Sequence, residues 1–164
     1  MEQNAIKLGR ITEKDRDAIA EIVTDKTVAK TYMLPDFTSD EQACGLFRRL
    51  MDLSNGETRY VRGIYAGDTL VGFLNDVEVK DGSAELGWVV HPGYHNRGYA
   101  TQAAKLAIGE LFARGFSEVV AGAFEGNVAS MRVMEKSGMT RLEKTDEIEY
   151  RGEVHRCIYY GIKK

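Results

Sequence analysis

Residues 88 to 101 read Trp88-Val89-Val90-His91-Pro92-Gly93-Tyr94-His95-Asn96-Arg97-Gly98-Tyr99-Ala100-Thr101 and are the most informative part of the chain. The apolar start is typical of a buried strand, and the polar middle with its glycines is typical of a loop. The alanine-rich run that follows predicts a helix from about Gly98 to Arg114, ended by Gly115. The start of such a helix exposes unpaired backbone N–H groups and a partial positive charge, which together favour an anion.

The residues at this loop–helix junction suit a phosphate ligand. Gly98 lets the backbone approach a phosphate because it has no Cβ, and Ala100 keeps the approach close two positions further on. Arg97 adds a cation and Thr101 adds a hydroxyl. Two other phosphate loops do not fit. Gly93 and Gly98 have the first spacing of a P-loop, but the Lys-Ser/Thr pair is missing, and no G-x-G-x-x-G follows a strand. The plain alternative is an ordinary tight turn between a strand and a helix.

The periodicity of the flanking sequence predicts a mixed sheet. Strands are expected around residues 6–11, 60–65, 69–79, 84–90, 116–123, 139–144 and 154–162. Besides the helix after Gly98, helices are expected after Thr12, after Thr38 or Ser39, and from Asn127 to Ser137. A crossover helix requires parallel strands on its two sides, here around Trp88 and Val120. The order predicts an α/β fold, with one domain over residues 1–164 and helices on both faces of a mostly antiparallel sheet of about seven strands.

Composition excludes several classes of protein. The chain has 164 residues, of which 43% are apolar, so it has enough material for a core. Its net charge of −3 argues against a protein that coats nucleic acid or an anionic membrane. No apolar run approaches the ~20 residues that cross a bilayer, and the N-terminus does not resemble a signal peptide. Cys44 and Cys157 lie far apart without a C-x-x-C pair, which indicates reduced thiols in a cytoplasmic protein. A metal site at His91 and His95 is not expected, because the Pro-Gly pair between them keeps them off one helix face.

Two segments carry a resemblance to a known family. His95-Asn96-Arg97-Gly98-Tyr99-Ala100 resembles the pyrophosphate-binding motif Arg/Gln-x-x-Gly-x-Gly/Ala of the GNAT superfamily of acetyltransferases. Asn127-Val128-Ala129-Ser130-Met131-Arg132-Val133-Met134-Glu135-Lys136-Ser137-Gly138-Met139 is similar to the Asn-x-x-Ser-x-x-x-x-Glu-Lys-x-Gly-Phe signature of its ribosomal-protein N-terminal acetyltransferase branch. The first motif alone is weak, but the pair in this strand–helix order is specific. Residues 84–88 and 150–160 also resemble that branch, so the resemblance covers nearly the whole chain.

The resemblance implies an acetyl-CoA-dependent N-acetyltransferase that transfers an acetyl group to a primary amine without a metal. The implied acceptor is the N-terminal α-amine of a protein or peptide. Alternatives are a small amine, such as a polyamine, an amino acid or an aminoglycoside, and a non-catalytic domain that binds acyl-CoA. The oligomeric state stays open, with a homodimer among the options. Coenzyme A is then expected to contact Trp88, Val89, Val90, His95, Asn96, Arg97, Gly98, Tyr99, Ala100, Thr101 and Asn127.

The reaction needs a base for the amine and a way for the thiolate to leave. Glu85 is the first candidate for the base, directly or through water, and Asp76, Glu78 and water alone are the alternatives. Ser130 is the candidate partner of the thiolate. Met134 stands where many family members have a Tyr that protonates the thiolate. A thiolate with a pKa of about 8.5 leaves tolerably without that acid.

Four further residues belong to the candidate site. His95 replaces the Arg or Gln of the family motif, which is compatible with binding because backbone N–H groups do most of the work. Gly87 predicts a bulge that would free backbone N–H groups for the thioester oxygen, with a packing gap as the alternative. Tyr32 and Phe37 are candidates to line the acceptor pocket.

Overall fold

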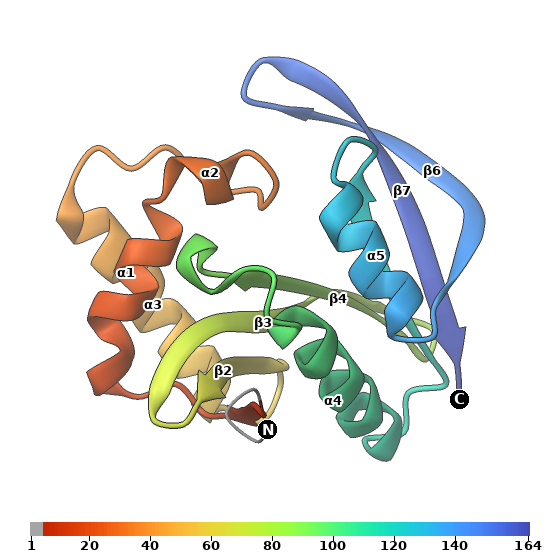
Figure 1. Cartoon of the computed structure of the whole chain (residues 1–164), viewed down its shortest axis with the longest axis horizontal. Helices are drawn as coiled ribbons and strands as arrows, with labels where there is room; N and C mark the ends of the chain where they lie inside the picture. Colours follow the sequence, from red (N-terminus) through yellow and green to blue (C-terminus); the bar gives the residue numbers. More distant parts are fainter. Residues whose placement is uncertain (1–4) are drawn as a thin grey trace. The chain divides into compact units, whose positions relative to one another are not determined.

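The computed structural model describes residues 5–164 and contains the predicted α/β fold with a seven-stranded, mostly antiparallel sheet (Figure 1). The strands follow the order β1-β2-β3-β4-β5-β7-β6. Their bounds are β1 Lys7–Gly9, β2 Val61–Ala66, β3 Thr69–Lys80, β4 Ser83–Val90, β5 Glu118–Phe124, β6 Thr140–Tyr150 and β7 Glu153–Lys163. The helices are η2 Glu13–Asp15, α1 Arg16–Val23, α2 Lys26–Ala29, α3 Asp40–Asn55, η3 Pro92–Tyr94, α4 Tyr99–Ala113 and α5 Val128–Lys136. Among the pairings described, β4–β5 is parallel, as the crossover through α4 requires.

Two elements differ from the sequence-based expectation. The helix α2 lies in a stretch that the sequence predicts as a loop, and it forms because Asp25 caps it by accepting the N–H groups of Thr27 and Val28 at 2.8 and 3.0 Å. Strand β6 continues to Tyr150, beyond the expected end at Lys144. Its residues are mostly exposed and polar, so hydrophobic periodicity does not reveal it, and backbone pairing with β7 holds it instead.

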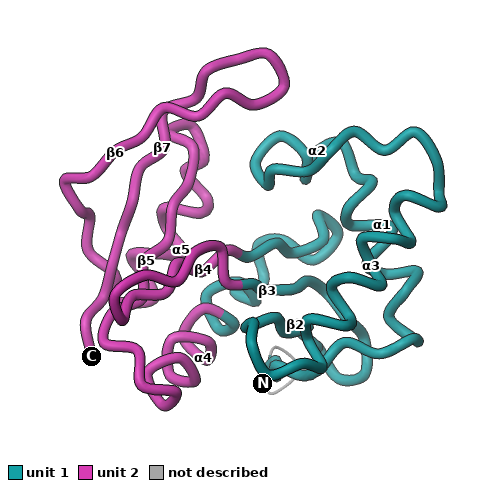
Figure 2. Tube along the Cα trace, turned by 180° about the vertical axis from the view of Figure 1, so that it is seen from behind, with its two compact units in different colours: residues 1–75, 88–103 teal, residues 76–87, 104–164 magenta. Residues whose placement is uncertain are grey.

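The described residues divide into two compact units (Figure 2). The first unit contains the residues up to Asn75 together with Trp88–Ala103, and the second contains Asp76–Gly87 together with Ala104–Lys164. The expectation that residues 1–164 form one domain stays a prediction.

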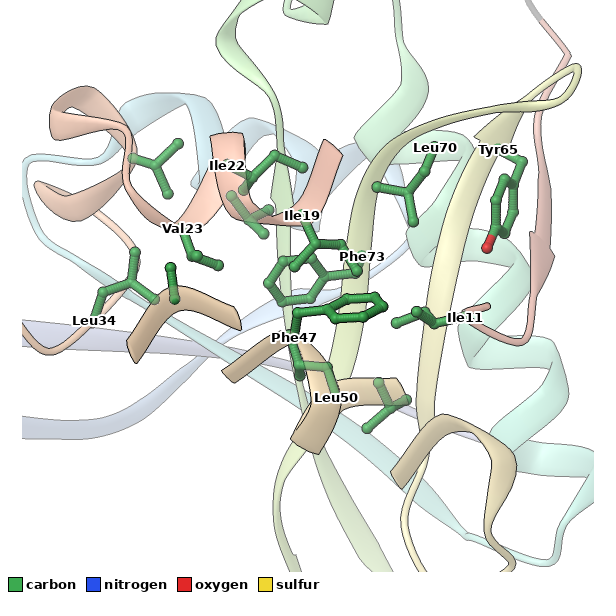
Figure 3. Packing of buried hydrophobic residues seen from close by; sticks show 14 residues of the cluster. Ile11, Ile19, Ile22, Val23, Leu34, Phe47, Leu50, Tyr65, Leu70 and Phe73 are labelled. Carbon is green, nitrogen blue, oxygen red and sulfur yellow. The ribbon is translucent and has the colours of Figure 1, made fainter. Parts of the chain in front are cut away.

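An apolar cluster forms the core of the first unit (Figure 3). Helices α1 and α3 bring Ile19 and Phe47 against Phe73 of β3, and all three side chains are at most 1% exposed. Burial of each such side chain contributes about 1.5–3 kcal/mol, which is why these short helices stay on the strands. Val89 of β4 belongs to the same cluster and is 7% exposed. The strand that leads into the loop before α4 is therefore anchored in this core.

The second unit packs α5 on one face of the strands β5 and β7. Met134 of α5 is fully buried, and the Tyr160 hydroxyl of β7 donates to Glu135 Oε2 of α5 at 3.1 Å. Because neighbouring residues of a strand point to opposite faces, Tyr159 lies on the face away from α5.

We expect Gly72→Ala and Gly45→Ala to change stability in opposite directions. A Cβ on Gly72 of β3 would collide with the Val89 carbonyl oxygen, so the backbone would have to shift. Overpacking of this kind costs about 1–3 kcal/mol. Gly45 is exposed in the middle of α3, where a Cβ meets nothing within 4 Å. Ala is favoured over Gly in a helix by roughly 0.5–1 kcal/mol, so this variant should be the more stable one. Urea unfolding measures both, and equal effects would contradict the close approach at Val89.

Candidate functional site

The loop between β4 and α4 has an unusual backbone at two residues. Asn96 has φ = 64° and Gly98 has φ = 77°, both in the left-handed region. Glycine adopts this conformation at no steric cost, which accounts for Gly98. A Cβ at Gly98 would meet nothing within 4 Å, so the space in front of this residue is open. Residues His95 to Gly98 are all exposed.

The start of α4 offers several hydrogen-bond donors. Gln102 N–H donates to the Gly98 carbonyl at 3.1 Å and is the first donor of the helix, so the N–H groups of residues 99–101 have no intrahelical acceptor. Gly98 has no side chain with which to cap them. Arg97 is exposed and its guanidinium lies 5.5 Å from the centroid of the Tyr94 ring. Open space, three backbone donors and one cation fit a pyrophosphate group.

The other predicted coenzyme A contacts of the first unit are more restricted. The side chains of Val89, Val90 and Tyr99 are buried, which leaves only their backbone for a ligand. Trp88, Ala100 and Thr101 are partly exposed. His95 Nε2 lies 2.8 Å from the Val90 carbonyl oxygen, to which it donates. The His95 side chain thus holds the loop in shape.

Glu85 lies in the second unit, where β4 runs parallel to β5. The described pairs run from Ser83↔Glu118 to Glu85↔Val120, and both strands continue beyond them. Glu85 is half-buried, and this burial raises the pKa of its carboxyl group. Lys144 lowers the pKa of Glu85, whereas Glu78 and Asp146 raise it.

A polar cluster on β6 and β7 accompanies Glu85, and the sequence reasoning missed it. The Tyr159 hydroxyl donates to Asp146 Oδ2 at 2.9 Å, and Lys144 Nζ lies 4.5 Å from the centroid of the Tyr159 ring. Cys157 is the register partner of Asp146. Burial raises the pKa values of Cys157 and Tyr159, and the charge of Glu85 raises them further. The alternation Lys144-x-Asp146 carried the signal, but the predicted strand ended at Lys144.

Asn127 and Ser130 are neighbours at the start of α5. Asn127 Oδ1 accepts the Ser130 N–H at 3.2 Å, so Asn127 caps the helix. Glu85 lies on the opposite face of the sheet from α5. It pairs with Val120, whereas the next residue, Ala121, pairs with Tyr160, which reaches α5. The structure therefore does not bring the two predicted catalytic residues onto one face.

Three residues near these candidates differ in their exposure. Met134 is fully buried and has no proton to donate, as its chemistry already implied. Of the alternative bases, Asp76 is only 4% exposed, whereas Glu78 is exposed. Water can reach Glu78 more readily than Asp76.

The first unit contains a cavity of about 200 Å³. Tyr32 lines it, and its hydroxyl donates to Asn75 Oδ1 at 2.7 Å at the cavity wall. Phe37, the other predicted pocket residue, packs against the apolar cluster instead. Arg49 and Arg59 also line the cavity, which is otherwise mostly apolar.

Within residues 5–164, no group of three or more His, Cys, Asp or Glu side chains could hold a metal ion. In the same part of the chain, every helix is too short or too polar to cross a membrane.

Comparison with known proteins gives a consistent picture. Residues 6–140 match the model of the acetyltransferase (GNAT) domain. The N-acetyltransferase YnaD of Bacillus subtilis (strain 168) is 30% identical over 134 residues, which cover 78% of this chain and 75% of YnaD. The ribosomal L7/L12 alpha-N-protein acetyltransferase RimL, solved with coenzyme A, superposes with a TM-score of 0.84 at 17% identity, covering 96% of this chain and 93% of RimL.

A spermidine N-acetyltransferase from Vibrio cholerae, solved with CoA and spermine, has a TM-score of 0.80 at 13% identity, covering 96% of this chain and 95% of that one. These two proteins share the fold of this chain, but one is an acetyltransferase of the ribosomal L7/L12 protein and the other an acetyltransferase of spermidine. The chain therefore belongs to the GNAT acetyltransferase family and is an N-acetyltransferase that uses acetyl-CoA as its co-substrate.

Proposed function

We propose that this enzyme acetylates the N-terminal α-amine of a peptide or protein, with Glu85 as the base. The observation that carries the proposal is the half-buried Glu85 carboxyl, whose burial raises its pKa. A carboxylate with a raised pKa holds a proton better than an ordinary one and is closer to neutral pH, where proton transfer is most effective. Acetyl-CoA supplies the acetyl group as an activated thioester.

The start of α4 is the proposed site of the co-substrate's pyrophosphate. The N–H groups of Tyr99, Ala100 and Thr101 would donate to phosphate oxygens, and Arg97 would add its charge. The backbone of Trp88–Val90 would hold the arm of the co-substrate. Asn127 remains a candidate contact of coenzyme A. Ser130 lies on the other face of the sheet from Glu85, and it remains the candidate whose hydroxyl would donate a hydrogen bond to the departing thiolate.

Different acceptor amines need different amounts of help from a base, because they differ in pKa. An α-amine has a pKa of about 7.7–8.0, whereas a lysine side chain has a pKa of about 10.4. A larger fraction of the α-amine is therefore already neutral at physiological pH. Met134 supplies no acid, and one carboxylate supplies the base. We therefore favour the α-amine, which loses its proton more easily than the lysine amine.

One observation favours a second candidate, a polyamine. Glu78 and Asp146 are close enough to Glu85 to influence its pKa, so three carboxylates share this region. A second ammonium group on the acceptor would find an opposite charge there. Lys144 opposes this reading, because its charge would repel that group.

A panel of acceptors tests the proposal. We expect kcat/KM at pH 7.5 for a short peptide with a free N-terminus to exceed that for spermidine by at least ~10-fold, or about 1.4 kcal/mol. The same peptide with a blocked N-terminus and a free lysine should be a poor acceptor. Thiol release in the presence of acetyl-CoA measures all three. If spermidine is preferred and Glu78→Gln removes that preference, the polyamine reading replaces this one.

The cellular location is part of the same proposal. Both cysteines, Cys44 and Cys157, are free thiols. Free thiols and a supply of acetyl-CoA are typical of the cytoplasm, where we place the reaction.

A further inference from the structure

We infer that Glu21 and His91 form a clamp that holds the loop before Gly98 in its anion-binding shape. Glu21 lies on α1, and His91 is the first residue after β4. Both are positioning residues, because they would act on the co-substrate through the loop. The inference rests on the pyrophosphate site proposed above, but it does not depend on which amine is the acceptor.

The His91 ring is bonded at both of its nitrogens. Gly93 N–H donates to His91 Nδ1 at 2.9 Å, so Nδ1 carries no hydrogen. The hydrogen must then be on Nε2, which lies 2.7 Å from Glu21 Oε1 and donates to it. One ring thus connects the turn at Gly93 to the helix α1. Loss of either partner would free the ring to rotate.

The rest of the loop is held from its other end. His95 Nε2 donates to the Val90 carbonyl at 2.8 Å, and His91 N–H donates to the Val71 carbonyl at 2.8 Å. Between these points, Tyr94 N–H donates to the His91 carbonyl at 2.8 Å. The short 3-10 turn η3 is therefore fastened to β3, β4 and α1. Residues 96–98, which follow, are exposed and contain the two left-handed conformations.

Fixing the turn should matter more for binding than for stability. The Glu21 side chain is 69% exposed and the His91 side chain is 22% exposed. A pair this exposed contributes little to the free energy of folding. A loop that is already ordered, however, loses less conformational entropy when it closes around a ligand. The clamp therefore predicts weaker binding of coenzyme A in its variants, with nearly unchanged thermal unfolding.

The first experiment measures the dissociation constant of coenzyme A by calorimetry. We expect His91→Ala, which loses both bonds, to raise it ~10-fold, and Glu21→Ala to raise it ~3-fold. His91→Asn should resemble Glu21→Ala, because an Asn oxygen before Pro92 can still accept the Gly93 N–H while the link to Glu21 is lost. Glu21→Gln keeps an acceptor and should stay within ~2-fold of the wild type. The double variant Glu21→Ala/His91→Asn should be no weaker than either single variant, since both remove the same bond.

Asp17→Ala is the matched control. Asp17 is an exposed carboxylate on the same helix whose described contact is with its neighbour Arg16. This variant removes the same charge from α1 without touching the loop, so coenzyme A affinity should not change.

The second experiment separates loop positioning from a general defect. With acetyl-CoA, His91→Ala should show a KM raised ~10-fold and a kcat within ~2-fold of the wild type. With S-acetyl-pantetheine, which lacks the pyrophosphate, kcat/KM should be the same for both enzymes.

An equal loss with both donors would overturn the inference, as would unchanged coenzyme A binding in His91→Ala. If Gly98→Asp weakens binding and the clamp variants do not, the clamp is wrong and the phosphate site stands. If His91→Ala fails to fold, the comparison of Glu21→Ala, Glu21→Gln and His91→Asn decides alone.

Discussion

Replacing Glu85 by Gln is expected to lower kcat/KM for the acceptor amine by ~100-fold or more at neutral pH. Gln keeps the shape and most hydrogen bonds of Glu but cannot accept a proton from the amine. Positioned proton transfer typically contributes 10²–10⁴-fold to a rate, and Glu85 is the half-buried carboxylate of the polar cluster on β4, β6 and β7. Steady-state kinetics with saturating acetyl-CoA measures the loss.

The pH dependence should change together with the rate. In the wild type, activity rises as Glu85 ionises, and the raised pKa of Glu85 moves this rise above the range of an ordinary carboxyl. The rise should disappear in Glu85→Gln, whose defect should shrink at high pH because more of the acceptor is already neutral. Lys144→Met removes the charge that lowers the pKa of Glu85, so the rise should shift to higher pH in that variant.

Stability supplies a control with a definite sign. A carboxyl group with a raised pKa in the folded state stabilises the fold below its unfolded pKa, and this contribution is lost as pH rises through the folded pKa. Glu85→Gln should therefore unfold at the same or a higher temperature than the wild type at pH 7, and the gain should vanish in acid. Coenzyme A affinity should barely change. A near-normal rate across the pH range would show that Glu85 is not the base and would leave Asp76, Glu78 or water.

Ser130→Ala separates the two proposed catalytic roles. If the Ser130 hydroxyl donates a hydrogen bond to the departing thiolate, Ser130→Ala slows the departure of the thiolate and does not affect deprotonation of the amine. High pH should then fail to rescue Ser130→Ala, in contrast to Glu85→Gln. Because the Asn127 cap accepts the backbone N–H of Ser130 and not its hydroxyl, this substitution leaves the start of α5 intact.

The architecture was predictable where local patterns and chain connectivity agree. The crossover from β4 through α4 to β5 follows from a buried strand, a glycine loop and an alanine-rich helix, and right-handed crossovers leave only a parallel pairing. The helix α2 was not predictable in this way, because its four residues form only with the Asp25 cap. The length of β6 was hidden for a different reason, since its pairing with β7 is a long-range backbone property that leaves no apolar alternation.

The candidate site shows the same division. In the loop between β4 and α4, Gly98 could be singled out from its residue type alone, and the structure adds its left-handed φ of 77°. The ring of His91, by contrast, joins residues 70 positions apart in the sequence. The polar residues that accompany Glu85 come from β6 and β7, and no sequence pattern near Glu85 predicts them. A local motif can therefore identify a candidate residue, but its hydrogen bonds and its pKa depend on residues far away in the sequence.

Gly98→Asp should weaken acetyl-CoA binding by ~30-fold or more, or about 2 kcal/mol. The new side chain would fill the open space in front of the α4 amides and place a carboxylate against two phosphates.

The backbone would also carry a side chain at φ = 77°, which costs some stability, so a second variant must separate the two effects. Gly115→Asp provides it, because Gly115 follows the other end of α4, has φ = 105° and also has nothing within 4 Å of an added Cβ. The two variants share the substitution and the kind of backbone strain but differ in their distance from the proposed phosphate site. Calorimetry should therefore show a large loss of coenzyme A affinity for Gly98→Asp and an unchanged affinity for Gly115→Asp. Equal affinities in the two folded variants would show that the pyrophosphate does not bind at the start of α4. The hydrogen bonds that hold the loop between Val90 and Tyr99 would then have no role in binding it.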